Sequence, residues 1–295
     1  KSIKRSKVIK ANSINLNLNF NPKINSIVKI NYSFNKNGTK KTYETFVENN
    51  IDLIENKNNF YNFEKNQILV KENNIIFQDK NYKINKPILV PENYNLIILD
   101  GANLLFSKNS YILINNGALK ILGKKDNKIN ITALENTWRG IHVIGNGKKS
   151  EIKHANFSKL NYFHNDKFNL TGAINFYNSN VEISNSLFHE TNSEDSVNFI
   201  KSKFYVNNTT FSKSISDAID SDFSSGKIEN SKFIDISGDA IDTSGSVVEV
   251  KETEIFNVGD KGISVGEDSS VKVSNILIDN AKIGIASKDS SKVTG

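Results

Sequence analysis

The sequence predicts an all-β protein whose larger part is a solenoid, a right-handed parallel β-helix with coils of about 22 residues. Three observations predict this fold class. An aliphatic residue recurs at a nearly fixed period, a second hydrophobic motif runs in step with it, and short alternating segments separated by turn residues lie between the two. No helical apolar period occurs in the repeats, so the pattern favours stacked strands.

The first landmark is an aliphatic marker among turn residues, as in "SDAIDSDFSSG", "GDAIDTSGS" and "DKGISVGEDS". The markers are Ile174, Val197, Ile219, Ile241, Ile263 and Ile285, at steps of 23, 22, 22, 22 and 22 residues. Such a period indicates stacked repeats that bury one equivalent side chain per coil. We therefore expect Ile174, Val197, Ile219, Ile241 and Ile263 to form one buried column.

The second landmark is a segment with an aliphatic residue first and a hydrophobic residue sixth. It reads "IKHANF", "ISNSLF", "VNNTTF", "IENSKF", "VKETEI" and "VSNILI" in successive repeats. Its third position holds an Asn in most repeats and His154 in the first, which predicts a stacked polar ladder. With short runs such as "VEV" between the landmarks, we expect three short strands per coil.

Three short strands cannot bury their apolar residues alone, so each coil requires neighbours about 4.8 Å away. Crossovers between parallel strands are right-handed. The step from Ile141 to Ile174 is 33 residues, and its surplus falls in "LNYFHNDKFNL", residues 160–170. This segment is predicted to project from one corner as a loop.

The chain divides into two parts by pattern. Residues 1–85 contain longer alternating runs, such as "INLNLNF", "IVKINYSF" and "TYETFV", and are predicted to form an N-terminal β module or lead-in. Residues 86–295 are predicted to form the β-helix. Because the chain begins at Lys1 and stops at "SKVTG" within a repeat, we expect a solenoid truncated at its C-terminus and a longer parent chain with other domains.

Composition narrows the function classes. A hydrophobic content of 37% suits a packed core, and the absence of Cys excludes disulfides and thiolate metal sites. No apolar run reaches the ~18 residues of a membrane span. Residues 171–295 carry 11 basic and 19 acidic residues, which argues against a nucleic-acid partner there.

Two polar columns flank the marker. Two positions before it come Asp195, Asp217 and Asp239, and one position after it come His142, Asn175, Asn198, Asp220 and Asp242. The residue just before the marker is always small. If the marker points inward, strand alternation turns both of its neighbours outward. The sequence therefore predicts a shallow groove with a floor of small residues and a polar stripe.

Asp220 and Asp242 are expected about 4.8 Å apart on adjacent coils, where their charges repel. A held proton, a raised pKa or a bound cation would relieve this repulsion. Calcium is the candidate cofactor, with Asp222 as a further metal ligand and Asn198, Asp217 and Asp239 as nearby ligand-binding groups, because it takes only oxygen ligands. Two alternatives stay open: a catalytic carboxyl pair, as in retaining glycosidases, and plain turn capping.

Arg139 and His142 form a second candidate site, beside the marker Ile141 and several coils from the aspartates. An arginine next to a histidine is able to neutralise a uronate and move a proton. The aromatic candidates for sugar stacking are Tyr162, Phe163, Phe168, Phe176 and Tyr177. Lys261 is the cation that the columns place near the aspartates.

The segments "LVPENYNLIILDGANLLF", "GALKILG" and "WRGIHV", followed by "DAID" and "GDKGISVGE", resemble right-handed parallel β-helix proteins of the pectin-lyase-like class. More narrowly, they resemble bacterial surface repeat proteins that sometimes accompany a spore-coat-kinase-like (CotH-type) domain. The resemblance implies the fold more than an activity, since this architecture serves lyases, hydrolases, epimerases, adhesins and spacers.

Two hypotheses follow. The first is a non-catalytic extracellular or cell-surface scaffold that binds polysaccharide or a cell-surface glycan along the acidic face. The alternative is a polysaccharide-active enzyme, a uronate lyase, hydrolase or epimerase, acting at the same face. We favour the first, because the carboxylates recur with the coil register and lack a well-placed cationic partner.

Overall fold

The computed structural model describes residues 27–32, 41–46, 68–145, 147–164 and 169–295. The chain forms two compact units, Lys1–Glu55 and Asn56–Gly295. In the first, strands β1 (Ile27–Tyr32) and β2 (Lys41–Phe46) pair antiparallel. Both fall on segments predicted as strands, whereas the run predicted at residues 14–20 lies outside the described residues.

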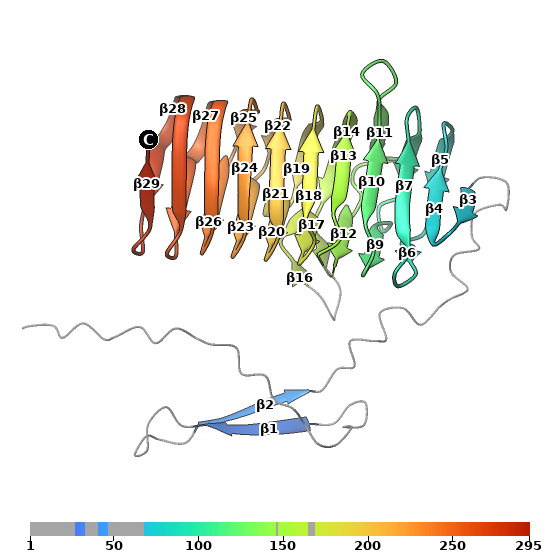
Figure 1. The fold of residues 1–295 in the computed structure, drawn as a ribbon, viewed down its shortest axis with the longest axis horizontal. Helices are drawn as coiled ribbons and strands as arrows, with labels where there is room; N and C mark the ends of the chain where they lie inside the picture. Colours follow the sequence, from blue (N-terminus) through green and yellow to red (C-terminus); the bar gives the residue numbers. More distant parts are fainter. Residues whose placement is uncertain (1–26, 33–40, 47–67, 146, 165–168) are drawn as a thin grey trace, which may run out of the picture. The chain divides into compact units, whose positions relative to one another are not determined.

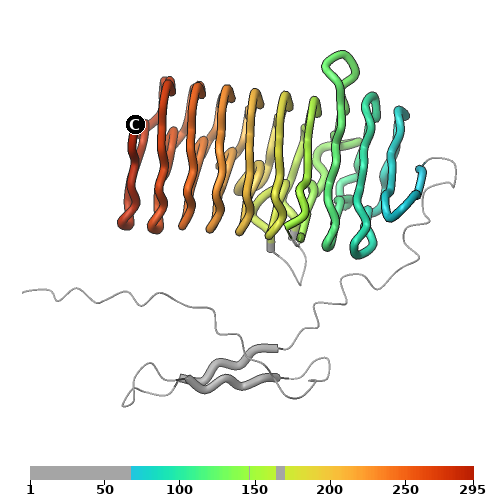
Figure 2. Tube along the Cα trace, viewed as in Figure 1, coloured from blue at the N-terminus to red at the C-terminus, as the bar shows by residue number. Residues whose placement is uncertain are grey.

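The second unit is a parallel β-solenoid, in which three columns of strands stack coil upon coil (Figures 1 and 2). The described part of the chain contains no helix, and therefore none long and apolar enough to cross a membrane. The fold class is thus the predicted one. The three columns follow one another along each coil, and we call them the marker, second and third columns.

The marker column carries the repeated aliphatic residue. Its strands are β6 (Ile88–Val90), β9 (Ile112–Asn115), β12 (Ile141–Ile144), β17 (Gly172–Tyr177), β20 (Asp195–Ile200), β23 (Asp217–Asp222), β26 (Ile241–Ser244) and the ends of the long strands β27 (Val247–Gly266) and β28 (Ser270–Ser287).

The other two columns have the same parallel register. The second contains β4 (Asn74–Phe77), β7 (Asn95–Leu99), β10 (Leu119–Leu122), β13 (Ser150–Lys153), β18 (Val181–Ser184), β21 (Lys203–Asn207), β24 (Ser225–Glu229), the starts of β27 and β28, and β29 (Lys292–Thr294). The third contains β5 (Asn81–Ile84), β8 (Asn103–Phe106), β11 (Ile129–Ala133), β14 (Ala155–Asn161), β19 (Leu187–Asn192), β22 (Thr210–Ser214), β25 (Lys232–Ile236) and the middles of β27 and β28.

The solenoid begins earlier than residue 86. Strands β4 and β5 pair in parallel with β7 and β8, and β3 (Ile68–Lys71) pairs antiparallel with β4. Residues 74–84, which the sequence pattern assigned to the lead-in, therefore belong to the stack. Their alternate residues are buried, but the first coil lacks the turn-flanked marker on which the prediction depended.

The predicted core column is confirmed. The marker side chains have no exposed surface in five successive coils, at Ile174, Val197, Ile219, Ile241 and Ile263. A second core ladder is aromatic: Phe157, Phe188, Phe211 and Phe233 occupy the sixth position of the second landmark. Successive ring centroids lie 4.9, 4.7 and 5.1 Å apart with nearly parallel planes.

The predicted polar ladder is a row of corner residues in the left-handed conformation. His154, Asn185, Asn208 and Asn230 have φ angles of 48°, 53°, 46° and 49°. Asn is among the residues that adopt this conformation most readily, which explains its recurrence. Asn208 also donates to Asn185 Oδ1 at 2.6 Å, so His154 replaces one member of a turn ladder.

A buried serine ladder was not predicted. The Oγ of each serine after the first accepts a hydrogen bond from the backbone N–H of the serine one coil earlier, over distances of 2.9 to 3.1 Å. The members are Ser179, Ser202, Ser224, Ser246, Ser269 and Ser291. Their spacing of 22 or 23 residues was visible in the sequence, but serine is so common in turns that its period attracted no notice.

The segment at 160–170 is an insertion, as predicted. It includes the antiparallel pair β15 (Phe163–His164) and β16 (Asn169–Leu170), between β14 and β17. Phe163 is buried against Tyr111 and His142, with ring centroids 4.6 and 4.8 Å away. The insertion therefore folds back onto the marker column in part.

Candidate functional site

The candidate site lies on the outer side of the marker column from β20 to β27. The parallel register aligns Asp195 with Asp217, and Asp220 with Asp242. We call these four residues, together with Asp222 and Asp239, the acidic stripe. It exists because the repeat places aspartates at the same positions of successive coils, which the stacking then brings together.

Within the described residues, the three carboxylates that come together are not the three predicted as metal ligands, although Asp220 and Asp222 do share a side-chain hydrogen bond. Oxygen atoms of Asp217, Asp239 and Asp242 all lie within 4.8 Å of one another. Asp242 belongs to both groups, whereas the prediction combined it with Asp220 and Asp222. Asp217 Oδ1 accepts a hydrogen bond from the backbone N–H of Asp239 at 2.7 Å, which ties the two coils together at this point.

The predicted groove floor is wrong. The small residues before the marker, such as Ala173, Ala218 and Ala240, are fully buried and do not face solvent. They mark a close approach between coils. At Gly140, an added Cβ would lie 1.7 Å from the carbonyl oxygen of Ala173, so a larger side chain would force the coils apart.

The polar residues of the stripe are more buried than a shallow groove would leave them. Asp195, Asn198 and Asp239 are 2%, 1% and 6% exposed. Thr171, which follows the insertion, covers one end: Asn198 Nδ2 donates to its Oγ1 at 3.0 Å. The same amide donates to Asp220 Oδ2 at 3.1 Å and, more weakly, to Asp222 Oδ2 at 3.3 Å. The stripe is therefore closed at the Asp195 end.

Burial dominates the electrostatics of the stripe. It raises the pKa of Asp195 to about 7 and that of Asp217 to about 6, and neighbouring carboxylates add to both shifts. Burial and then the charge of Asp195 also raise the pKa of Asp220. Lys261 is the counter-charge, with its Nζ 3.3 Å from Asp239 Oδ1 and 2.5 Å from Asp260 Oδ2. Burial and mutual repulsion therefore oppose full ionisation of the stripe near neutral pH unless a cation is bound.

Two buried oxygen atoms beside the stripe have no hydrogen-bond partner. These are Asn198 Oδ1 and Ser264 Oγ, whose residues are 1% and 0% exposed. They flank the aspartate pair, since Asn198 is in register with Asp220 and Ser264 with Asp242. A buried unsatisfied oxygen costs about 1–3 kcal/mol. This donor set of carboxylate, amide and hydroxyl oxygens fits a hard cation such as Ca²⁺.

The second predicted site is not a surface site. His142 has no exposed surface and lies beneath Phe163 of the insertion. Its Nε2 is 2.8 Å from the backbone oxygen of Arg139, and its Nδ1 is 3.0 Å from Asn175 Nδ2. The amide donates to Nδ1, which places the imidazole proton on Nε2. Burial lowers the pKa of His142 to about 4, so the ring is neutral and structural at physiological pH. The prediction failed because the insertion covers this part of the marker column.

The predicted aromatic candidates divide into buried and exposed residues. Phe176 is a fully buried strand residue, while Tyr162 and Tyr177 are exposed. Lys201 Nζ lies 5.9 Å from the centre of the Tyr177 ring. Phe168 lies outside the described residues. Sequence reasoning missed Phe223, which is 63% exposed at a corner of the coil beside the stripe.

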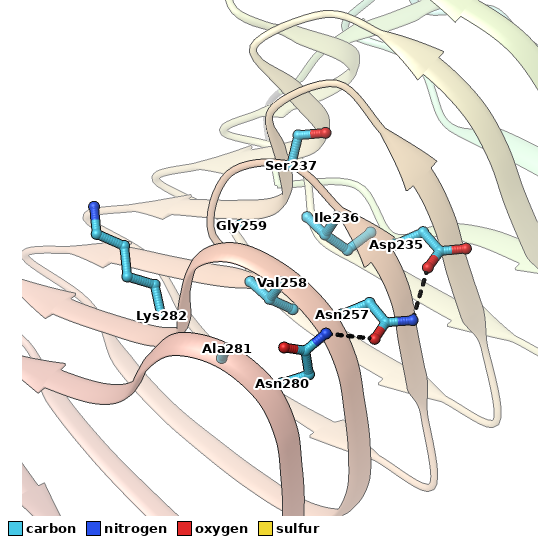
Figure 3. A pocket seen from close by; sticks show the side chains of 9 residues that line it. All are labelled: Asp235, Ile236, Ser237, Asn257, Val258, Gly259, Asn280, Ala281 and Lys282. Atoms are coloured by element: carbon cyan, nitrogen blue, oxygen red, sulfur yellow. Dashed lines mark hydrogen bonds between the residues drawn. The ribbon is translucent and has the colours of Figure 1, made fainter.

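A hollow of about 590 Å³ lies at the corner between the third and marker columns (Figure 3). Asn280 donates to Asn257 Oδ1 at 2.9 Å, and Asn257 donates to Asp235 Oδ1 at 3.0 Å. Ser237 and Gly259 line the hollow two residues before Asp239 and Lys261. The hollow therefore adjoins the strand ends from which the stripe begins.

A histidine and a serine meet on the third column. His189 Nδ1 is 2.9 Å from Ser212 Oγ, and His189 Nε2 is 3.4 Å from Glu190 Oε1. Acyl transfer would also need backbone N–H groups aimed at an oxyanion. The strands here pair on both sides, β22 with β19 and β25, so their N–H groups are engaged in the sheet. This cluster is a surface contact between coils.

Comparison with known proteins supports the fold. A family model described as "Right handed beta helix region" matches residues 196–294. The second unit is a right-handed parallel β-helix. Among solved structures, it is similar to an alginate lyase from Paenibacillus sp. str. FPU-7, with 14% identity, a TM-score of 0.31, and coverage of 60% of this chain and 70% of that chain. A likeness at this level carries no argument about function. No curated protein matches the chain.

Proposed function

We propose that this chain is a non-catalytic β-helical scaffold, extracellular or at a cell surface, that binds glycans along its acidic stripe. The proposal includes calcium as the cofactor and places the chain within a longer surface protein, as its sequence resemblance suggests. The observation that carries it is the convergence of three carboxylates from adjacent coils, with oxygen atoms within 4.8 Å. The unpartnered buried oxygen of Ser264 is in register with one of them, Asp242, and that of Asn198 is in register with Asp220. Such a set favours holding a cation over moving a proton.

The stripe is poorly arranged for catalysis. Proton abstraction next to a uronate needs a base and a cationic neutraliser that converge on one sugar. Lys261 already pairs with Asp239 and Asp260, and His142 is buried and neutral. Arg139 immediately precedes β12, several coils from the carboxylates, so it does not complete a site with them.

The enzyme hypothesis keeps one favourable observation. The pKa of Asp195 is raised to about 7 by burial, which is the range that suits a general acid or base at neutral pH. A panel assay for new reducing ends and for the ultraviolet absorbance of unsaturated products would test it. We expect no turnover of pectate, alginate or neutral glycans. Turnover that disappears in Asp195→Asn or Asp242→Asn would establish the enzyme instead.

Calcium binding is tested by calorimetry and thermal unfolding of the whole chain. We expect heat of binding and a higher melting temperature at millimolar calcium, as for extracellular calcium modules. Asp242→Asn should lose both effects, because Asp242 contributes to the group of three carboxylates whose oxygen atoms lie within 4.8 Å of one another. The matched control is Asp279→Asn on an exposed position of β28, which should bind calcium normally. If the unmodified chain gives neither heat nor stabilisation, the aspartates only cap turns.

A further inference from the structure

Phe223 has an unusual conformation for a bulky side chain. Its φ is 50°, in the left-handed region that bulky L-residues seldom adopt. Other coils place residues of a different kind at this corner, namely Asn178, Lys201, Gly245 and Glu267. Phe223 nevertheless leaves 63% of its surface exposed, so the strain is not compensated by burial in the core. Strain of this kind is a reason to look for a function.

The ring of Phe223 rests on the next coil. A Cβ built on Gly245 would lie 2.7 Å from Phe223 Cδ1 and 2.9 Å from its Cε1, so only glycine leaves room for the ring there. The backbone N–H of Phe223 donates to the carbonyl oxygen of Ser244 at 2.8 Å. The corner of one coil and the glycine of the next therefore hold the ring in place while much of it stays in contact with solvent.

The surroundings of the ring are rich in hydrogen-bond acceptors and negative charge. Asp222 immediately precedes Phe223, and Asp220 lies on the same strand. Glu267 occupies the same corner two coils further on, and its negative charge contributes to the raised pKa of Asp222. Lys201, at the corner one coil earlier, lies over Tyr177. An aromatic ring beside carboxylates suits a sugar whose apolar face stacks on the ring and whose hydroxyls donate to the carboxylates.

We propose that Phe223 is the stacking platform of a glycan subsite, and that this subsite takes a neutral sugar residue. The inference rests on the proposed function, because it names the class of glycan that the acidic stripe would bind. Sugar hydroxyls can both donate to and accept from Asp220 and Asp222, whereas a uronate would add a further carboxyl group to a stripe that already contains six. The contact with Phe223 itself does not require calcium.

The experiment compares Phe223→Gly with the unmodified chain. Glycine adopts a φ of 50° without strain, so this variant should fold at least as well, and thermal unfolding will verify it. The probes are hexamers of β-1,4-linked glucose, of β-1,4-linked mannose and of galacturonic acid, titrated by calorimetry with and without calcium. We expect a neutral hexamer to bind the unmodified chain without calcium. Its affinity for Phe223→Gly should be about tenfold lower, a loss that corresponds to the binding energy of about one stacking contact.

Two controls separate the possible failures. Leu277→Ser removes a side chain that is 52% exposed on the third column, away from the acidic stripe, and should leave binding of the neutral hexamer unchanged. Calcium heat should persist in Phe223→Gly, so a lost sugar contact is distinguished from a lost cation site. Equal affinity of Phe223→Gly and the unmodified chain would overturn the platform. Binding of neither neutral hexamer, or of the uronate hexamer alone, would overturn the ligand class.

Discussion

Replacing one marker residue with a charge tests the coil register directly. Ile241 has no exposed surface and lies between Ile219 and Ile263 in the marker column, paired with both through the parallel sheet. Changing Ile241 to Asp puts a carboxyl group into a column of aliphatic side chains. Since the solenoid is stabilised by contacts between neighbouring coils, damage to this coil separates the coils before it from those after it.

The expected loss of stability is large. Truncating a fully buried Ile costs about 2–5 kcal/mol, because the lost apolar contact adds to the cavity that remains. A buried carboxyl group without a partner adds several kcal/mol more. Together these terms approach the ~5–15 kcal/mol by which a typical domain is stable. We therefore expect Ile241→Asp to lose cooperative unfolding at ambient temperature.

The assay is urea unfolding followed by far-ultraviolet circular dichroism. Ile283→Asp is the matched control, since Ile283 is 43% exposed and in register with Lys261 on the outer side of the same column. That variant should stay within about 0.5 kcal/mol of the unmodified chain. Ile241→Val provides a graded test that should fold, with an expected loss of about 0.5–1.5 kcal/mol. If Ile241→Asp unfolds like the control, the marker does not point into the core.

Three further predictions concern the ladders and the stripe. The melting temperature should fall as the pH rises from about 4 to about 7. The pKa of Asp195 is raised in the folded state, so in this range the folded protein binds a proton that the unfolded protein has released. Asp195→Asn should make the melting temperature less dependent on pH. Ser224→Ala should cost about 1–3 kcal/mol in urea unfolding, because it leaves the buried N–H of Ser202 unpaired, while the exposed Ser290→Ala should cost little. Phe211→Ala should cost about 3–5 kcal/mol, since the ring is fully buried between Phe188 and Phe233, and a loss below 1 kcal/mol would show that the aromatic ladder is not part of the packed core.

Periodicity explains what could be predicted from the sequence. A buried column requires an apolar residue once per coil, so the recurrence of Ile219, Ile241 and Ile263 predicted both the fold and the register. The same logic predicted that Asp220 and Asp242 are neighbours. Both predictions depend only on the stacking of equivalent positions, which the sequence contains.

The predictions that failed depend on residues outside the repeat. Asp195 and Asn198 both hydrogen-bond to Thr171, which directly follows the insertion and lies at the Asp195 end of the stripe. His142 is buried beneath Phe163 of the insertion. An insertion leaves no periodic signal that shows which side of the solenoid it covers. Phe223 is the single aromatic residue among the left-handed corner positions compared above, and these positions could be aligned only when the structure had located the corner.

The buried serine ladder and the acidic stripe differ in whether their polar atoms have hydrogen-bond partners within the chain. The buried serine ladder is satisfied: each Oγ accepts from one coil, and Ser224 Oγ also donates to the carbonyl oxygen of Phe199. Such a ladder stabilises the stack without a ligand. The acidic stripe is not satisfied, since its crowded carboxyls oppose one another's ionisation and Asn198 Oδ1 and Ser264 Oγ lack partners. Unfavourable interactions at equivalent positions of adjacent coils weaken the stack, unless a cation or a donor-rich ligand is present. We therefore locate the function of this chain at the stripe and not in its equally periodic interior.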